Sequence, residues 1–131
     1  MGARVLASDL DERMVAGTRA TLERFGVPQV AVETRDVGEL LTWTGGALDA
    51  VISDPPYGRA STTNLEPLAD LYERFLDAAH AALRPGGRLA VIFPSDALRA
   101  RAVEKGFRLL EAHEQRVHRS MTRHYGIFFR D

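Results

Sequence analysis

Short blocks of apolar and polar residues alternate along this chain and predict strands and helices in turn. The apolar segments 4–8, 29–33 and 48–53 are too short for helices and are typical of strands. The segment 48–53 is apolar at successive positions, as strands covered on both faces are, so we expect both of its faces to be buried. These segments supply the first half of a sheet.

Helical periodicity predicts three helices between the strands. Asp11 can cap a helix that stops at Gly26, and a further helix is expected over 96–105. The helix at 66–83 is the clearest, and the Arg-Pro-Gly-Gly segment at 84–87 is expected to break it. Its apolar face recurs every three or four positions and comprises Leu68, Leu71, Tyr72, Phe75, Leu76, Ala79, Ala82 and Leu83.

Three further strands are predicted at 88–93, 108–116 and 124–129. The last two are joined by the short segment 117–123 without a helix, so the final strand is expected to run antiparallel. Strands that alternate with helices predict an α/β fold, with a mostly parallel sheet of the Rossmann type wrapped on both faces.

Three aspartates follow predicted strands: Asp9, Asp36 and Asp54. In open α/β sheets, ligands bind beyond the carboxyl ends of the strands. The sequence therefore predicts a site at the rim where these three acids gather.

The most specific local signal is the run Asp54, Pro55, Pro56, Tyr57 and Gly58 at the end of a strand. Proline fixes its own φ, restricts the residue before it and offers no N–H, so the turn presents acceptors. The Asp54 carboxylate and the Pro55 carbonyl suit an amino group, and the Tyr57 ring can stack on a base. The alternative is an ordinary tight turn.

Composition narrows the class of protein. A chain of 131 residues with 45% hydrophobic and 27% charged residues is typical of one globular domain. No apolar run approaches the roughly 20 residues of a membrane span. The absence of cysteine excludes disulfides and fits a cytoplasmic location. The four histidines lack metal-binding spacing, so we expect no metal.

Charge is balanced overall but not along the chain. The net charge of −1 gives no general attraction to nucleic acid. The segment from residue 113 onward is nevertheless basic. It holds three histidines and Arg116, Arg119, Arg123 and Arg130, against Glu114 and Asp131.

The Asp-Pro-Pro-Tyr run resembles the motif of amino-directed, S-adenosylmethionine-dependent methyltransferases, which methylate exocyclic amines of adenine or guanine. The resemblance extends through Asp9 and the Leu-Arg-Pro-Gly-Gly segment at 83–87. The residues 54–59 with the Ser/Thr-rich loop after them, and the terminal 118–123, are similar to archaeal tRNA guanosine-10 N2-methyltransferases. The implied fold is the Rossmann-like class I methyltransferase sheet.

The resemblance implies a role for each site residue. Asp9 and Leu10 would bind the cofactor ribose, or Asp9 would only help Asp11 to start a helix. Asp36 would accept from the adenine amine with Val37 on the ring, or be a solvated turn residue. Asp54 and the Pro55 carbonyl would hold the guanine N2 amine beside the cofactor methyl, so Asp54 is expected to contact the cofactor as well. Pro56 would shape the turn and Tyr57 would stack on the base. The expected RNA contacts are Gly58, Arg59, Arg119 and Arg123. A solvated hairpin loop is the alternative for the two terminal arginines.

The family pattern normally begins with a strand that enters a Gly-rich turn for the methionine part of the cofactor. This strand lies in the middle of the sheet, between the strands that end at Asp9 and Asp54. No such turn precedes Val5 or follows the last strand. We therefore expect residues 1–131 to be the C-terminal two-thirds of a catalytic domain, which a preceding portion or a second subunit would complete. Alone, the chain should bind cofactor weakly and methylate poorly.

Two other functions remain open at this point. One is methylation of base amines in DNA or ribosomal RNA, at adenine N6 or guanine N2. The other is a remnant without catalysis that binds RNA or a partner.

Overall fold

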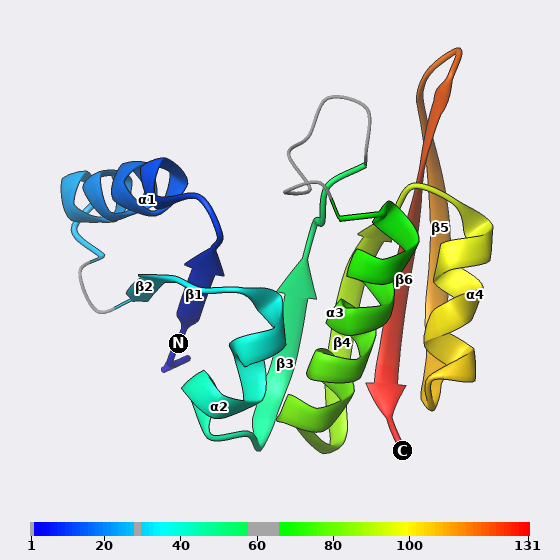
Figure 1. Ribbon diagram of the computed structural model, residues 1–131, viewed down its shortest axis with the longest axis horizontal. Helices are drawn as coiled ribbons and strands as arrows, with labels where there is room; N and C mark the ends of the chain where they lie inside the picture. Colours follow the sequence, from blue (N-terminus) through cyan, green and yellow to red (C-terminus); the bar gives the residue numbers. More distant parts are fainter. Residues whose placement is uncertain (1, 28–29, 58–65) are drawn as a thin grey trace.

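The computed structural model describes residues 2–27, 30–57 and 66–131 (Figure 1). The first part of the chain forms β1 (Leu6–Asp9), α1 (Glu12–Arg24), β2 (Ala31–Thr34), the 3-10 helix η1 (Val37–Glu39) and α2 (Leu40–Thr44). The second part forms β3 (Leu48–Ser53), α3 (Leu68–Ala82), β4 (Leu83–Phe93), α4 (Asp96–Glu104), β5 (Phe107–His118) and β6 (Met121–Arg130).

The strands form two sheets. β1 and β2 pair in parallel, and the second sheet has the order β3-β4-β6-β5. Within it, β3, β4 and β5 share one direction and β6 runs antiparallel between β4 and β5. The α/β class and the antiparallel last strand are confirmed. The division between the two sheets lies between β1 and β3, which point the same way (Figure 1). The central strand of the family was expected at this position.

The main core lies between one face of the larger sheet and the helices α3 and α4. Its side chains come from alternate positions of β4 (Leu89, Val91 and Phe93) and from the apolar face predicted for α3. The Phe93 ring also meets Phe128 of β6 edge to face, with centroids 6.2 Å apart. This packing fixes the carboxyl end of β4, beside which the rim is built.

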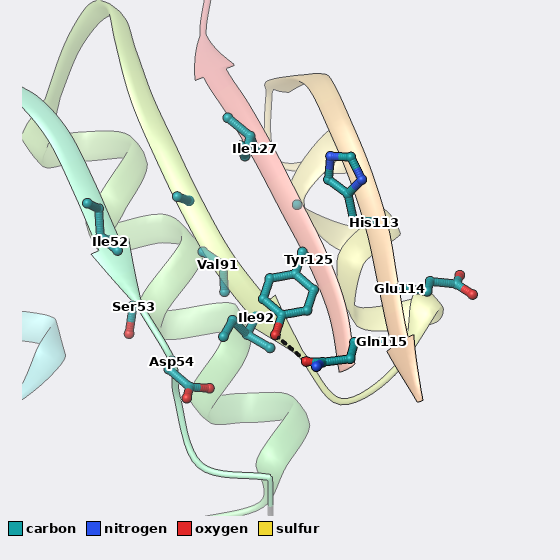
Figure 2. A pocket seen from close by; sticks show the side chains of 12 residues that line it. Ile52, Ser53, Asp54, Val91, Ile92, His113, Glu114, Gln115, Tyr125 and Ile127 are labelled. Carbon is teal, nitrogen blue, oxygen red and sulfur yellow. Dashed lines mark hydrogen bonds between the residues drawn. The ribbon is translucent and has the colours of Figure 1, made fainter. Parts of the chain in front are cut away.

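The opposite face of the larger sheet is open. The Ile52 side chain is 81% exposed there, so the prediction that both faces of this strand are buried is wrong. Ile52, Ala90, Ile92 and Ile127 instead line an apolar hollow of about 700 Å³ (Figure 2). Among the described residues, helices cover only the other side of this strand.

Two predicted connections are also shorter than expected. The segment 84–87 is a bulge inside β4, because Leu48 pairs with Leu83 and Ala50 already pairs with Arg88. Gly86 has a φ of +77° in this bulge, which favours glycine. The segment 117–123 is mostly strand, and only residues 119 and 120 separate β5 from β6. No helix in the described part of the chain is long and apolar enough to cross a bilayer.

Candidate functional site at the carboxyl ends of the strands

All three predicted acids lie at or shortly after the carboxyl ends of strands, as the sequence predicted. Asp9 is the last residue of β1, Asp36 follows β2 as the N-cap of η1, and Asp54 directly follows β3. The carboxyl ends of β1 and β3 face the same edge of the molecule (Figure 1). The acids therefore belong to one rim, on both sides of the split between the sheets.

The 54–57 turn (Asp54, Pro55, Pro56 and Tyr57) is held by its own side chains. The Tyr57 hydroxyl donates a hydrogen bond to Oδ1 of Asp54. Pro55 is buried, whereas Asp54 is exposed and reaches solvent. Burial, followed by the hydrogen bond to Asp54, raises the pKa of the Tyr57 phenol above its usual value. The turn thus presents a neutral aromatic hydroxyl beside a carboxylate.

Tyr72 of α3 contacts this turn from the core side. It is fully buried, and its single O–H proton is shared between the Pro56 and Ile92 carbonyls, both 3.5 Å away. These long bonds join the turn to the end of β4. Periodicity predicted Tyr72 only as a core residue. The signal for its second role is a tyrosine among aliphatic helix positions, since a buried phenol needs a polar partner.

Only one of the two predicted RNA-binding arginines lies beside the turn. The Arg123 guanidinium carbon is 5.9 Å from the centroid of the Tyr57 ring, near the outer limit of a cation–π contact. Its Nε atom is buried without a hydrogen-bond partner among the described residues. Arg119 instead lies at the tip of the β5–β6 hairpin, which extends past the rest of the sheet (Figure 1).

Two aspartates at the end of β1, Asp9 and Asp11, accept different hydrogen bonds. Asp11 is the N-cap of α1 and accepts from the Arg13 N–H. Asp9 Oδ1 accepts from the Asp11 N–H at 2.8 Å. Asp9 therefore does help to start the helix, as one alternative held, but this uses only one of its oxygens. Leu10, between them, is 50% exposed.

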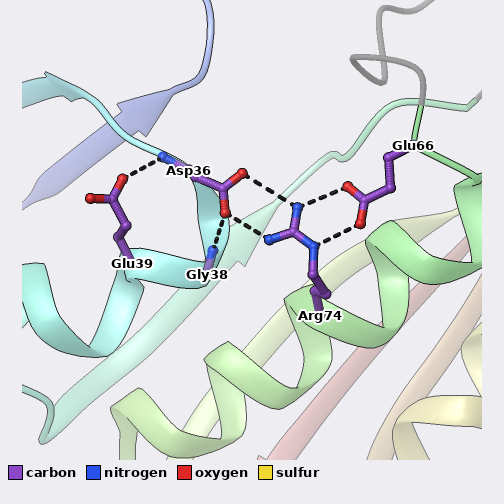
Figure 3. A network of polar contacts seen from close by, with 5 residues as sticks. All are labelled: Asp36, Gly38, Glu39, Glu66 and Arg74. Atoms are coloured by element: carbon purple, nitrogen blue, oxygen red, sulfur yellow. Dashed lines mark hydrogen bonds and ion pairs between the residues drawn. The ribbon is translucent and has the colours of Figure 1, made fainter.

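Asp36 belongs to a polar network rather than to a solvated turn (Figure 3). Its Oδ1 accepts from the Gly38 N–H and from Arg74 of α3, both at 2.7 Å. Arg74 and then the Gly38 N–H lower the pKa of Asp36 below its usual value, although partial burial opposes them. Val37 packs against the main core and is half-buried. Arg74 was not predictable from local sequence, because its partner lies 38 positions away.

The acceptors at this rim match the chemistry of the expected cofactor. Ribose hydroxyls and an adenine amine are donors, and the carboxylates of Asp9 and Asp36 each retain acceptor capacity at the carboxyl end of a strand. The open hollow also reaches this rim, since Ser53 and Asp54 lie at its end (Figure 2). Gly58 and Arg59 lie outside the described residues. Over the described ranges, no cluster of side chains could hold a metal.

The sequence match to known families decides the class of protein. The family described as RMKL-like, methyltransferase domain matches residues 2–125. The chain belongs to this family. The matched region of this RMKL-like methyltransferase domain contains the 54–57 turn, all three rim acids and Arg123.

Relatives with curated names agree with this family. The chain is 37% identical over 123 residues to the tRNA (guanine(10)-N2)-dimethyltransferase of Methanothermobacter thermautotrophicus, covering 94% of this chain and 36% of the relative. It is 35% identical to the enzyme of that name from Pyrococcus abyssi, over 97% of this chain and 38% of the relative. The RMKL-like domain described here thus spans little more than a third of the length of these relatives.

A solved structure resembles the fold closely. TrmN from Thermus thermophilus superposes with a TM-score of 0.81 at 28% identity, over 97% of this chain and 36% of that chain. The similarity extends through both sheets, because nearly all of the chain is covered. The class I methyltransferase fold expected from the sequence is therefore confirmed.

Proposed function

We propose that this chain provides the C-terminal two-thirds of the catalytic domain of an S-adenosylmethionine-dependent RNA methyltransferase that acts on N2 of guanine in tRNA. The observation that carries the proposal is the 54–57 turn, in which a carboxylate and an aromatic ring stand together at the rim of a methyltransferase sheet. The names of the relatives support guanine N2 in tRNA as the target.

The turn can activate an amine by holding it. The lone pair of a guanine amine is delocalised into the ring, which makes the nitrogen a poor nucleophile. A hydrogen bond to Asp54, with a second to the Pro55 carbonyl, would orient the nitrogen and stabilise the positive charge that develops on it. The nitrogen then loses a proton readily, so Asp54 needs no special tuning as a base. Tyr57 would stack on the base.

The cofactor, S-adenosylmethionine, supplies an electrophilic methyl group when bound. Asp9 and Leu10 would hold its ribose, and Asp36 with Val37 its adenine. Asp9 uses one oxygen for the Asp11 N–H, so its second oxygen can accept from a ribose hydroxyl. Arg123, and Arg119 farther along the hairpin, would contact phosphates of the RNA near the target base.

We further propose that another part of the methyltransferase domain completes this site, either in the same polypeptide or in a second subunit. Three observations support this. The sheets part between β1 and β3, the Ile52 face of β3 is open, and the chain spans 36% to 38% of its curated relatives. The added part would supply the strand and the Gly-rich turn of the family pattern. We place the action of the completed enzyme on tRNA in the cytoplasm.

The proposal is tested with radiolabelled S-adenosylmethionine and two tRNA transcripts, one normal and one with inosine at the target guanine. Inosine lacks only the N2 amine. We expect slow labelling of the normal transcript by the chain, no labelling of the inosine transcript, and a loss of roughly a hundredfold or more in Asp54→Ala. Equal labelling of both transcripts would exclude guanine N2. Fast turnover by the chain alone would exclude the need for a completing part.

A further inference from the structure

Arg74 of α3 lies between two carboxylates that come from separate parts of the chain (Figure 3). Its Nε and Nη2 atoms donate to the two oxygens of Glu66 at 2.7 and 2.8 Å. Its Nη1 donates to Asp36 Oδ1 at 2.7 Å, and Nη2 also reaches Asp36 Oδ2 at 3.3 Å. The planar guanidinium is therefore fixed by Glu66 along one edge while it holds Asp36 with the other.

The two oxygens of Asp36 are used unequally. Oδ1 accepts two short bonds, from Arg74 and from the Gly38 N–H. Oδ2 receives only the longer contact from Arg74. A carboxylate oxygen can accept more than one hydrogen bond, so the short bonds orient the group while Oδ2 keeps capacity for another donor.

The charge of the cluster suits an acceptor. One guanidinium between two carboxylates leaves a net negative charge, and Arg74 lowers the pKa of both Asp36 and Glu66. The side chains of Arg74 and Asp36 are 42% and 38% exposed. Ion pairs this exposed add little to stability, so the pair matters more for orientation than for folding.

Gly38 leaves the space that the pair needs. A Cβ atom at this position would lie 3.0 Å from Asp36 Oδ1 and 3.1 Å from Arg74 Nη1. Both distances are tighter than ordinary van der Waals contact, so a side chain here would force the carboxylate, the guanidinium or both to shift by a few tenths of an ångström. Gly38→Ala therefore perturbs the geometry of the pair without removing a charge.

We propose that Arg74, itself held by Glu66, is a positioning residue that presents Asp36 Oδ2 to the exocyclic amine of the cofactor's adenine. This inference rests on the proposed function, because it assumes that the rim binds S-adenosylmethionine. It adds a residue of α3 to the cofactor site. It also gives the site a basis for selecting adenine over a purine that lacks the amine.

The experiment compares the binding of S-adenosylhomocysteine with that of S-inosylhomocysteine, which carries an oxygen in place of the amine, by calorimetry. The unsubstituted chain should prefer the adenine ligand. Arg74→Ala should reduce this preference by roughly tenfold, which corresponds to about 1.4 kcal/mol. Arg74→Lys should recover part of it, because lysine restores the charge but not the fork. Gly38→Ala and Glu66→Gln should reduce it as well.

Arg101→Ala is the matched control. Arg101 is 43% exposed and also pairs with a carboxylate of α3, Glu73, but it lies on α4. It should leave the preference unchanged. If Arg74→Ala weakens both ligands equally, its role is merely structural and the inference fails. If the unsubstituted chain binds both ligands equally, Asp36 does not read the amine and the inference also fails. If it binds neither ligand even at millimolar ligand concentration, the rim does not hold the adenosine of the cofactor, and both the inference and the cofactor part of the proposed function fail.

Discussion

The hydroxyl of Tyr57 donates to Oδ1 of Asp54, so the ring and the carboxylate of the turn are fixed relative to each other. The second oxygen of Asp54 takes no part in this bond and can accept from another donor. In the proposed complex, a base that stacks on the Tyr57 ring would bring its amine to this oxygen. One hydrogen bond between residues three positions apart thus sets the relation between the ring and the carboxylate.

The Tyr57 phenol should titrate at higher pH than an ordinary tyrosine. Burial raises its pKa first, and the bond to Asp54 adds to this because it favours the neutral phenol. The folded state therefore keeps this proton as the pH rises above about 10, where the unfolded chain loses it. The contribution to stability should be complete below that pH and should be lost progressively as the pH rises from about 10 through the raised pKa of Tyr57.

Ultraviolet titration of phenolate absorbance measures this, and Tyr57→Phe identifies the signal. In Asp54→Asn the charge is gone, so the pKa of Tyr57 should fall toward its usual value. A Tyr57 signal at the ordinary pKa in the unsubstituted chain would contradict the hydrogen bond.

Glu73 should stabilise the packing of α3 against α4 in a pH-dependent way. Its carboxylate binds Arg101 at 2.6 Å and Lys105 at 2.8 Å, and these two bonds lower the pKa of Glu73 to about 2. A lowered pKa means that the contribution is present above the usual value of 4.5 and is lost as the pH falls toward 2. Denaturation of Glu73→Gln and the unsubstituted chain should differ at neutral pH and converge in acid. A difference that persists at the lowest pH would show that the charge is not responsible.

Gly126→Ala should destabilise the larger sheet. A Cβ atom on Gly126 of β6 would lie 2.4 and 2.7 Å from two atoms of the Phe128 ring, which is fully buried. Moving this ring disturbs Phe93, so we expect a loss of about 1–3 kcal/mol in the free energy of unfolding. Gly17→Ala is the control, because that helical position has open space around it and should gain about 0.5–1 kcal/mol. Chemical denaturation compares the two. A neutral Gly126→Ala would mean that the ring has room to move.

Arg123 and Arg119 should affect RNA binding differently. Both are expected to meet phosphates, so each alanine variant should reduce the salt dependence of tRNA binding by about one unit of slope. Arg123 also lies near the Tyr57 ring, at the outer limit of a cation–π contact, so only Arg123→Ala should weaken the preference for guanine over inosine at the target. Arg84→Ala removes the same charge at the opposite end of β4 and serves as the control. If Arg84→Ala reduces the salt dependence of tRNA binding as much as the other two variants, the effect comes from net charge alone.

Several features of this protein follow from local sequence. The spacing of apolar residues predicted the helix at 66–83, and the structure has it at Leu68–Ala82 with the same buried face. The 54–57 turn was also predictable, because proline restricts its own backbone and that of its neighbour regardless of the surroundings. The three rim acids were located by their positions after the strands.

Other features depended on how distant segments pack. The pairing of Asp36 with Arg74 joins residues 38 positions apart, and the Tyr72 hydroxyl reaches a carbonyl 16 positions away. The bulge at 84–87 arises from the register of β4 against β3, which a local turn signal does not report. The apolar run at 48–53 predicted that Ile52 is buried, but the exposure of its side chain depends on what covers that face of the sheet. The sequence alone determined the elements, the rim acids and the rigid turn, since these arise from short-range sterics and periodicity. The side chains that hold the rim acids and the turn in place depend on the tertiary structure, because their contacts form when segments far apart in the chain are packed together.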